Sequence, residues 1–318
     1  MLLGSIGFMM GVFYMVNHSD KDMVINTWKV ICSTISIFVA VLMFQAINGI
    51  VKVTFLEGAS EEKMLVAAFL HAGFWFLFLQ FFLAFVSGAV ELPCVTSHKQ
   101  EIHDNPVLKQ KAADKLFLDM KCWAIILGHI TGFACIGAWC QAQQFVKHSI
   151  GLSFAIVPLA AFVTWTAYKV SDMIRYRIAM GDDGVEDEFE KAWDEATEET
   201  EDDVMGLTVS FLLVQAIRFS VVGVLPNEEG NFEEDITVSD YQVFMMVSIG
   251  VVVGVLSFLR TVFIDLKHLG RLNAWVRLVC DFVFSWSLMF AIEAYLATHG
   301  LGGSVMGCIG EVVQANLV

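Results

Sequence analysis

The sequence predicts an all-α, polytopic integral membrane protein with about eight transmembrane helices. Hydrophobic residues make up 57% of the 318 residues, charged residues only 17%, and the mean hydropathy is +0.66. These values lie outside the range of soluble globular domains and inside that of membrane proteins. The apolar residues form runs that approach the roughly 20 residues a helix needs to cross the hydrocarbon core. In addition, the connecting loops alternate in their content of lysine and arginine.

Eight apolar runs are candidate spans, and polar residues separate each from the next. The runs are Leu2–Val16, Thr27–Val53, Met64–Val90, Met120–Val146, Ser149–Ile174, Val204–Leu225, Tyr241–Ile264 and Ala274–Ala297. Leu2–Val16 is the shortest and is either a first span or an uncleaved signal anchor. Pro158 is expected to kink the fifth span. The tail, 299–318, begins with a glycine-rich stretch that is too short to span and is expected to pack or fray.

Lysine and arginine collect in alternate loops, as they do in membrane proteins whose basic loops face the cytoplasm. Fifteen lie in or beside the loops after the odd-numbered spans, and only Lys52, Lys63 and Lys147 in those after the even-numbered spans. A missed or an invented span would blur this alternation. The pattern therefore predicts eight crossings, with the basic loops in the cytoplasm and both termini on the non-cytoplasmic side.

Two sets of matching segments indicate a tandem duplication. The outline of Thr34–Asn48, TISIFVAVLMFQAIN, recurs in Thr208–Arg218, TVSFLLVQAIR, and in both a Gln lies three residues before a second polar residue. Trp123 precedes His129 by six residues, as Trp275 precedes Asp281. Such a duplication divides the chain into four-helix halves at 1–148 and 149–298, related by a pseudo-two-fold axis along the membrane normal. The alternative is that apolar helices match one another by chance.

The loop Gly181–Asp203 is strongly acidic, with 13 acids and one Lys. Phe189 and Trp193 lie four residues apart, which suggests a short acidic helix leading into the sixth span. Its charges predict a solvated face that keeps the loop out of the bilayer. The alternative is a site for a cation or a basic partner, although the ligand order of an EF-hand is missing.

Polar and ionisable residues deep inside the spans are the candidates for function, because burying them in hydrocarbon costs several kcal/mol unless they face protein or water. The candidates for a transport path are Gln45, Asn48, His129, Gln215, Arg218, Asp281 and Glu293. We hypothesise that Asp281 or Glu293 neutralises Arg218, and that these residues line a polar path between the two halves. The alternative is that the amides are interhelical glue and that Arg218 closes a structural ion pair.

Several function classes find no support in the sequence. Nucleic-acid binding needs clustered basic residues, and the net charge is −15. Enzyme motifs such as HExxH, GxSxG, the P-loop and GxGxxG are missing, so we expect no enzyme. No cofactor and no metal site are expected, because the seven cysteines are scattered and only His71 and His129 lie well within spans.

Two functions remain. The first is a membrane channel or transporter for a small ion or solute, with a cation favoured because acids crowd the loops on both sides. The second is a non-catalytic scaffold subunit of a membrane complex, for which continuous apolar helices suffice. The expected partners are the lipid bilayer and either further copies of the chain or other membrane subunits.

Overall fold

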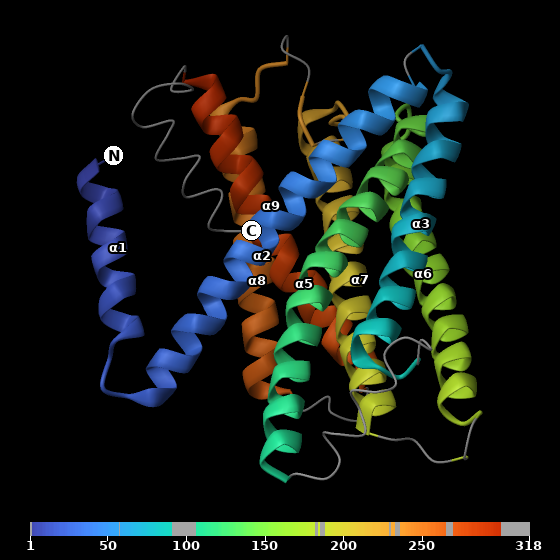
Figure 1. Cartoon of the computed structure of the whole chain (residues 1–318). Helices are drawn as coiled ribbons and strands as arrows, with labels where there is room; N and C mark the ends of the chain where they lie inside the picture. Colours follow the sequence, from blue (N-terminus) through green and yellow to red (C-terminus); the bar gives the residue numbers. More distant parts are fainter. Residues whose placement is uncertain are drawn as a thin grey trace. The chain divides into compact units, whose positions relative to one another are not determined.

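The computed structural model describes residues 2–56, 58–90, 106–181, 184, 188–228, 230–232, 236–264 and 270–299. Within these ranges every regular element is a helix and no strand is present, which confirms the all-α class. The helices are α1 (Leu2–Val16), α2 (Lys21–Val51), the π-helical turn η1 (Lys52–Leu56), α3 (Glu61–Ser87), α5 (Pro106–Phe145), α6 (Ile150–Ala179), α7 (Glu188–Val222), α8 (Asp240–Phe263) and α9 (Arg271–Thr298) (Figure 1).

Seven of these helices are long and apolar enough to cross a membrane, as the fold of a multi-pass integral membrane protein requires. They are α2, α3, α5, α6, α7, α8 and α9, and each contains the core of a predicted span. Helix α1 forms where the first run was predicted, but it has only 15 residues. An eighth crossing through α1 therefore stays a prediction, as do the sidedness of the loops and the position of the termini.

Local signals in the sequence explain where two of the spans begin and end. Ser239 caps α8, because its hydroxyl accepts a hydrogen bond from the Gln242 backbone and the Gln242 side chain bonds back to Ser239. This reciprocal capping box satisfies two backbone donors at the helix start. Helix α3 ends at Gly88, whose φ of 79° is in the left-handed region that favours glycine.

Helix α7 begins 16 residues before the predicted sixth span, so the acidic stretch and the span are one helix. The predicted solvated face is only part of this stretch: Lys191 and Glu195 are exposed, whereas Trp193 and Glu201 are buried. The buried positions recur every three to four residues, which is the periodicity of one helix face. They are Glu190, Trp193, Thr197, Thr200, Glu201 and Val204.

The chain forms two compact units that alternate along the sequence. Unit 1 consists of Met1–Ile35, Trp139–Pro158 and Gly206–Val318, and unit 2 of Ser36–Ala138 and Leu159–Met205. Each unit contains residues from both predicted halves. The division into 1–148 and 149–298 and the tandem repeat stay predictions, and all of the predicted tail 299–318 except His299 lies outside the described residues.

The core of unit 2 is made by α2, α3, α5 and the first half of α7, around Leu79, Leu83, Ile130 and Trp193. The rings of Phe82 and Trp123 meet edge to face with centroids 4.8 Å apart. Gly128 permits a close approach of α5 to α7, since a Cβ there would lie 2.7 Å from the Thr200 methyl carbon.

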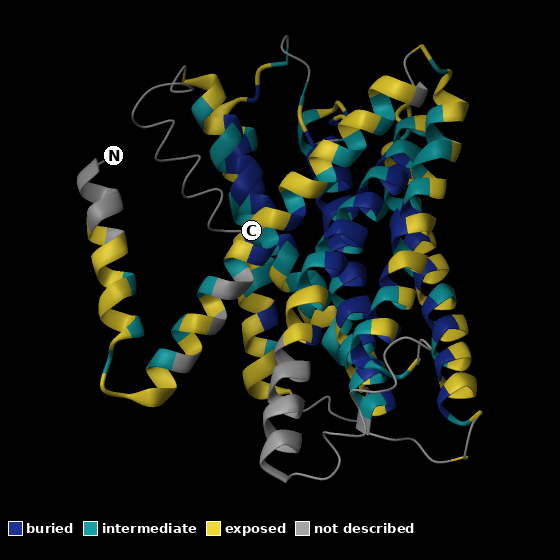
Figure 2. Ribbon diagram, viewed as in Figure 1, coloured by how far each residue is buried: buried dark blue, intermediate teal, exposed yellow. Residues whose placement is uncertain are grey.

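Unit 1 packs α8 against α9 through small residues, a common way for membrane helices to approach closely. A Cβ on Gly250 would lie 2.7 Å from that of Ser287, and one on Gly254 would lie 2.9 Å from the Phe284 ring. The rest of α8 exposes large apolar side chains, among them Phe244, Leu256 and Phe258 (yellow in Figure 2). An apolar exposed face of this length is suited to lipid contact.

Candidate functional site

Arg218 lies on α7 with only 3% of its surface exposed, and it binds a turn of the chain that follows α7. Its Nη1 donates to the Gly230 carbonyl at 2.6 Å and lies 3.4 Å from the Gln215 Oε1. Gln215, one turn earlier on α7, donates from Nε2 to the Asn227 carbonyl at 2.9 Å. Two of the predicted path residues are therefore neighbours, and both hold the turn through its backbone.

Two aromatic rings complete the surroundings of the guanidinium group. Its Cζ lies 3.9 Å from the ring centroid of Phe290 on α9 and 4.6 Å from that of Phe232. Cation–π contacts of this kind stabilise a desolvated cation by about 2 kcal/mol. Gly230 has a φ of 88°, and a Cβ there would lie 2.7 Å from the Phe290 ring, so the turn requires glycine on both counts.

Helices α5 and α9 hold the same segment at further points. Gln144 on α5 donates from Nε2 to the Pro226 carbonyl at 2.6 Å, and its neighbour Gln141 bonds the Glu228 carboxylate. Thr298 on α9 donates to the Val238 carbonyl at 2.9 Å. Side chains of α5, α7 and α9 thus tie the segment between α7 and α8 to unit 1. We call the described residues 226–228 and 230–232 the bound turn.

The two acids predicted to neutralise Arg218 occupy different environments. Glu293, half-buried on α9, interacts electrostatically with Arg218 but forms no direct ion pair with it in the described part of the chain. Asp281 is exposed and accepts a hydrogen bond from Ser257 on α8 at 2.8 Å. Asp281 lies 12 residues from Glu293, about 18 Å along α9. Of the two acids, only Glu293 is placed to influence Arg218.

The remaining predicted path residues belong to unit 2. Gln45 on α2 is exposed, and Asn48, one turn later, is half-buried. His129 on α5 is half-buried, and its Nδ1 contacts the Ile125 carbonyl of its own helix at 2.8 Å. Unit 1 therefore contains Gln215, Arg218 and Glu293 together with Asp281, which lies earlier on α9, and unit 2 contains Gln45, Asn48 and His129.

A second group of buried polar residues lies where α5, α6 and α7 meet in unit 1. Gln143 is 1% exposed and donates from Nε2 to the carbonyls of Ser153 on α6, at 3.1 Å, and Leu212 on α7, at 3.2 Å. Gln143 is not among the path residues predicted from the sequence. The available signal was its position, since Gln141, Gln143 and Gln144 are amides in the last two turns of an apolar helix.

Several buried polar atoms of unit 1 have no hydrogen-bond partner among the described residues. They are Gln143 Oε1, Ser153 Oγ, Thr208 Oγ1, Arg218 Nε and Trp286 Nε1. An unsatisfied buried polar group costs about 1–3 kcal/mol. Native proteins rarely leave such groups without water, an ion or a ligand. The interior of unit 1 therefore has free hydrogen-bonding capacity.

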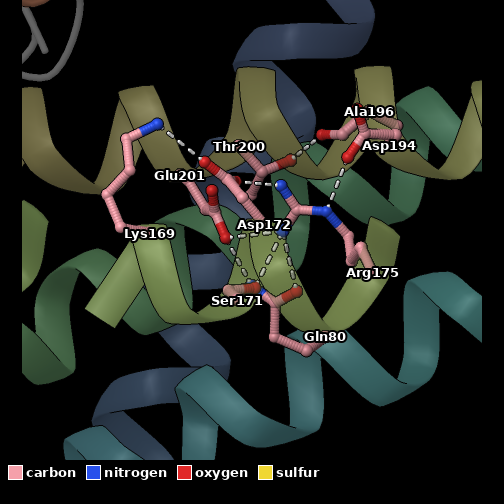
Figure 3. A network of polar contacts seen from close by, with 9 residues as sticks. All are labelled: Gln80, Lys169, Ser171, Asp172, Arg175, Asp194, Ala196, Thr200 and Glu201. Atoms are coloured by element: carbon pink, nitrogen blue, oxygen red, sulfur yellow. Dashed lines mark hydrogen bonds and ion pairs between the residues drawn. The ribbon is translucent and has the colours of Figure 1, made fainter. Parts of the chain in front are cut away.

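Unit 2 contains a second buried arginine, Arg175, near the end of α6 (Figure 3). Its Nε donates to Asp194 at 2.7 Å, its Nη2 to Asp172 at 2.5 Å, and its Nη1 to Glu201 at 2.9 Å. Ser171 accepts a further bond from Nη1 at 2.8 Å. All three guanidinium nitrogens are therefore bonded, and three carboxylates surround the cation.

Gln80 joins α3 to the same group. Its Nε2 donates to Glu201 Oε1 at 2.8 Å, and its Oε1 lies 3.3 Å from Arg175 Nη1. We call Gln80, Ser171, Asp172, Arg175, Asp194 and Glu201 the Arg175 cluster. By hydropathy alone, Arg175 is predicted to lie in a basic loop and Glu201 in the acidic loop. The helical spacing of Trp193, Thr197 and Glu201 was the signal for a buried face.

No protein-family model, no curated protein and no solved structure matches the chain. Among the described residues, no group of three or more His, Cys, Asp or Glu side chains is placed to hold a metal ion. Cys122, Cys135, Cys140 and Cys280 are free thiols.

Proposed function

We propose that the protein is a membrane channel or transporter for a small ion or solute, with a cation favoured. The observation that carries this proposal is the set of unpartnered polar atoms in unit 1, on Gln143, Ser153, Thr208 and Arg218. All four residues lie in helices that are apolar enough to span a membrane. Apolar residues at these positions would avoid the cost of burying polar groups, so their presence supports a polar interior that receives water or a solute.

The preference for a cation rests on the acids at one end of the spans. Glu228 and Asp240 lie between α7 and α8, and Glu61 and Glu62 begin α3. The predicted topology places all four on the non-cytoplasmic side, where they would raise the local concentration of cations. Eight crossings, with both termini on that side, are part of the proposal.

The Arg175 cluster agrees with the crossing order on which this topology depends. It joins Gln80, near the end of α3, to Arg175, near the end of α6. The rings of Phe76 and Tyr168, further back on the same two helices, are stacked with centroids 5.8 Å apart. Spans three and five therefore run in the same direction, as two odd-numbered spans must.

Ion flux through purified protein in liposomes tests the proposal. We expect flux of an alkali cation, and we expect Thr208→Val, which removes an unpartnered hydroxyl, to change it severalfold. Thr166→Val is the matched control, because Thr166 is exposed on α6 and bonds the Phe162 carbonyl of its own helix. Absence of flux for cations, anions and small neutral solutes alike would contradict transport.

A scaffold subunit is the alternative, and the exposure of α2 favours it. In the most apolar stretch of α2 only 11% of the residues are buried, against 72% in the corresponding stretch of α7. Helix α2 therefore offers most of its surface to lipid or to another subunit. This function predicts that the protein conducts nothing and that replacing Leu42 or Ile50 on α2 by Trp disrupts an assembly measurable by single-molecule subunit counting.

A further inference from the structure

Helix α2 carries an amide side chain on its outer face at the middle of a membrane span. The span is Thr34–Thr54, and Gln45 lies at its centre. In unit 2, α2 packs on the core through Ala40, Phe44 and Ile47. Gln45 lies on the other side of the helix and is exposed. The described residues of the chain therefore leave an amide uncovered at the depth of the hydrocarbon core.

The Gln45 amide forms no hydrogen bond with any described residue. By contrast, the Thr34 hydroxyl on the same helix donates to the Val30 carbonyl at 2.8 Å. A glutamine amide has two N–H donors and an acceptor oxygen, whereas the carbonyls inside a helix are already bonded. Lipid tails offer no hydrogen bonds, and polar side chains in spans almost always face protein or water. We therefore expect Gln45 to have a partner outside its own chain.

The residues around Gln45 have the spacing of a helix–helix interface. Four exposed residues follow one another at steps of four, three and four positions: Phe38, Leu42, Gln45 and Gly49. Two helices supercoil through residues with this heptad spacing, and a single polar residue among them fixes the register. A Cβ on Gly49 would meet nothing within 4 Å, so a second helix can approach closely there. The outer face of α2 is therefore suited to contact with another helix.

Another copy of the chain supplies the helix that fits this face. Copies inserted in one membrane have the same orientation, so a two-fold axis along the membrane normal brings Gln45 of each copy to the same depth. The glutamine amide is both donor and acceptor, so two such amides can bond each other reciprocally. A different subunit would need a polar side chain of its own at that depth.

We propose that the outer face of α2 is a homodimer interface, in which the Gln45 amides of two copies bond each other and Gly49 lets the two helices approach. This inference moves Gln45 from the predicted transport path to a contact between subunits. It does not depend on the transport function, because the unpartnered atoms that carry that proposal all lie in unit 1. A channel, a transporter and a scaffold can each be dimeric.

The experiment counts the subunits of the full chain, labelled with one fluorophore per molecule, in phosphatidylcholine vesicles at falling protein-to-lipid ratio. We expect two photobleaching steps per assembly at high ratio and one at low ratio. Gln45→Leu is expected to weaken dimerisation about tenfold, which corresponds to about 1.4 kcal/mol, because it removes the reciprocal hydrogen bonds. Gln45→Asn, which keeps an amide, is expected to weaken it less. Gly49→Leu is expected to weaken it at least as much as Gln45→Leu, because the added side chain separates the helices.

Gly73→Leu is the matched control for Gly49→Leu, because Gly73 is exposed on α3 and a Cβ there also meets nothing within 4 Å. Thr166→Val is the control for the loss of a polar group, because Thr166 is exposed on α6 and bonds its own helix. Both controls are expected to leave the dimer unchanged. A single photobleaching step at every ratio, or a dimer that Gln45→Leu and Gly49→Leu both leave unchanged, would overturn the interface.

Photocrosslinking keeps the test valid without any change at Gln45. Benzoylphenylalanine in place of Phe38 is expected to join two copies covalently, whereas the same group in place of Phe162, which is exposed on α6, is expected to join none. Crosslinks from position 38 to lipid alone would overturn the interface. Flux decides transport separately: a dimer without flux keeps the interface and removes transport, and flux from a monomer does the reverse.

Discussion

Two buried arginines, Arg175 in unit 2 and Arg218 in unit 1, show two different ways to hold a positive charge inside this protein. Each is 3% exposed. Arg175 bonds through all three guanidinium nitrogens and has three carboxylates around it. Among the described residues, Arg218 bonds through Nη1 alone, to a carbonyl and an amide oxygen, rests against two phenyl rings, and leaves Nε unpartnered.

The two arginines differ in how completely the polar groups around them find hydrogen-bond partners. In the Arg175 cluster every nitrogen of the cation has an acceptor and three carboxylates surround it, so the cluster can fix α3, α6 and α7 of unit 2 to one another. The region around Arg218 and Gln143 retains free donors and acceptors. Trp193 Nε1 and Thr197 Oγ1 of unit 2 are also without a partner among the described residues, so the contrast lies in the surroundings of the two arginines. The carboxylates around Arg175 fit a structural role, and the unpartnered atoms of unit 1 support the transport function that we propose.

The largest effect on stability is expected from breaking the buried ion pair between Arg175 and Glu201. Arg175→Leu leaves Glu201, which is 1% exposed, as a buried charge without its cation. Removing one partner of a buried ion pair costs about 3–5 kcal/mol. We therefore expect Arg175→Leu to lower the free energy of unfolding in detergent by about that amount. The double variant with Glu201→Leu should recover part of the loss, because the buried carboxylate is then removed together with its cation.

Arg177→Leu is the control for this prediction, because Arg177 lies two residues further along α6 and is exposed. An exposed charge of this kind is expected to change the stability by less than about 1 kcal/mol. Equal losses for Arg175→Leu and Arg177→Leu would show that the Arg175 cluster does not stabilise unit 2.

A smaller effect is expected from displacing the bound turn of unit 1. Gly230→Ala combines a left-handed backbone with a Cβ 2.7 Å from the Phe290 ring that stacks on Arg218. The backbone contributes about 1–2 kcal/mol and the overpacking about 1–3 kcal/mol. Gly223→Ala measures the backbone contribution by itself, since Gly223 has the same φ of 88° and nothing within 4 Å of the added Cβ.

The difference in unfolding free energy between these two alanine variants measures the contact between the turn and Phe290. We expect Gly230→Ala to be the less stable by at least about 1 kcal/mol, and the labelling of a cysteine at the exposed Asn231 to become faster in that background. Matching stabilities and labelling rates would mean that the turn is not held against α9.

The smallest effect on stability is expected in two double-mutant cycles, which test which acid neutralises the charge of Arg218. Arg218→Ala with Glu293→Ala should give a coupling energy of about 0.5–1 kcal/mol, since the two groups interact without a direct ion pair. Arg218→Ala with Asp281→Ala should be additive within about 0.5 kcal/mol, because Asp281 bonds Ser257 instead. Stability against thermal unfolding in detergent is the measurement, and a larger coupling with Asp281 would reverse the assignment.

The sequence was most informative about features that depend on a single helix, such as the position of a membrane span. Seven predicted spans contain the cores of the observed helices, because a run of apolar residues shows its preference for hydrocarbon in its own composition. The observed ends differ most where polar residues continue a helix, as in α5, which begins at Pro106, and in α7, which begins at Glu188. Hydropathy alone assigns such residues to loops.

The candidate site was predicted in part for the same reason. Arg218 and Gln215 stand out as polar residues in apolar surroundings, and the structure brings them together on one face of α7. Glu201 was not predicted to be buried, because it is one of 13 acids in 181–203, although it is one of the most deeply buried of the described side chains. Its spacing from Trp193 and Thr197 indicates a buried face, but its partner Gln80 lies 121 residues away, and no pattern within α7 identifies that partner.

By itself the sequence predicted that the chain is helical, that it contains apolar runs long enough to span a bilayer, and that a few polar residues lie inside them. Only the tertiary structure decided that carboxylates surround Arg175 and that a backbone turn and two rings surround Arg218. It also decided that Gln143 donates both of its N–H groups to carbonyls of α6 and α7. The physical reason is that solvent preference is a property of each residue and its periodicity, whereas a hydrogen-bond partner is supplied by contacts between helices far apart in the chain.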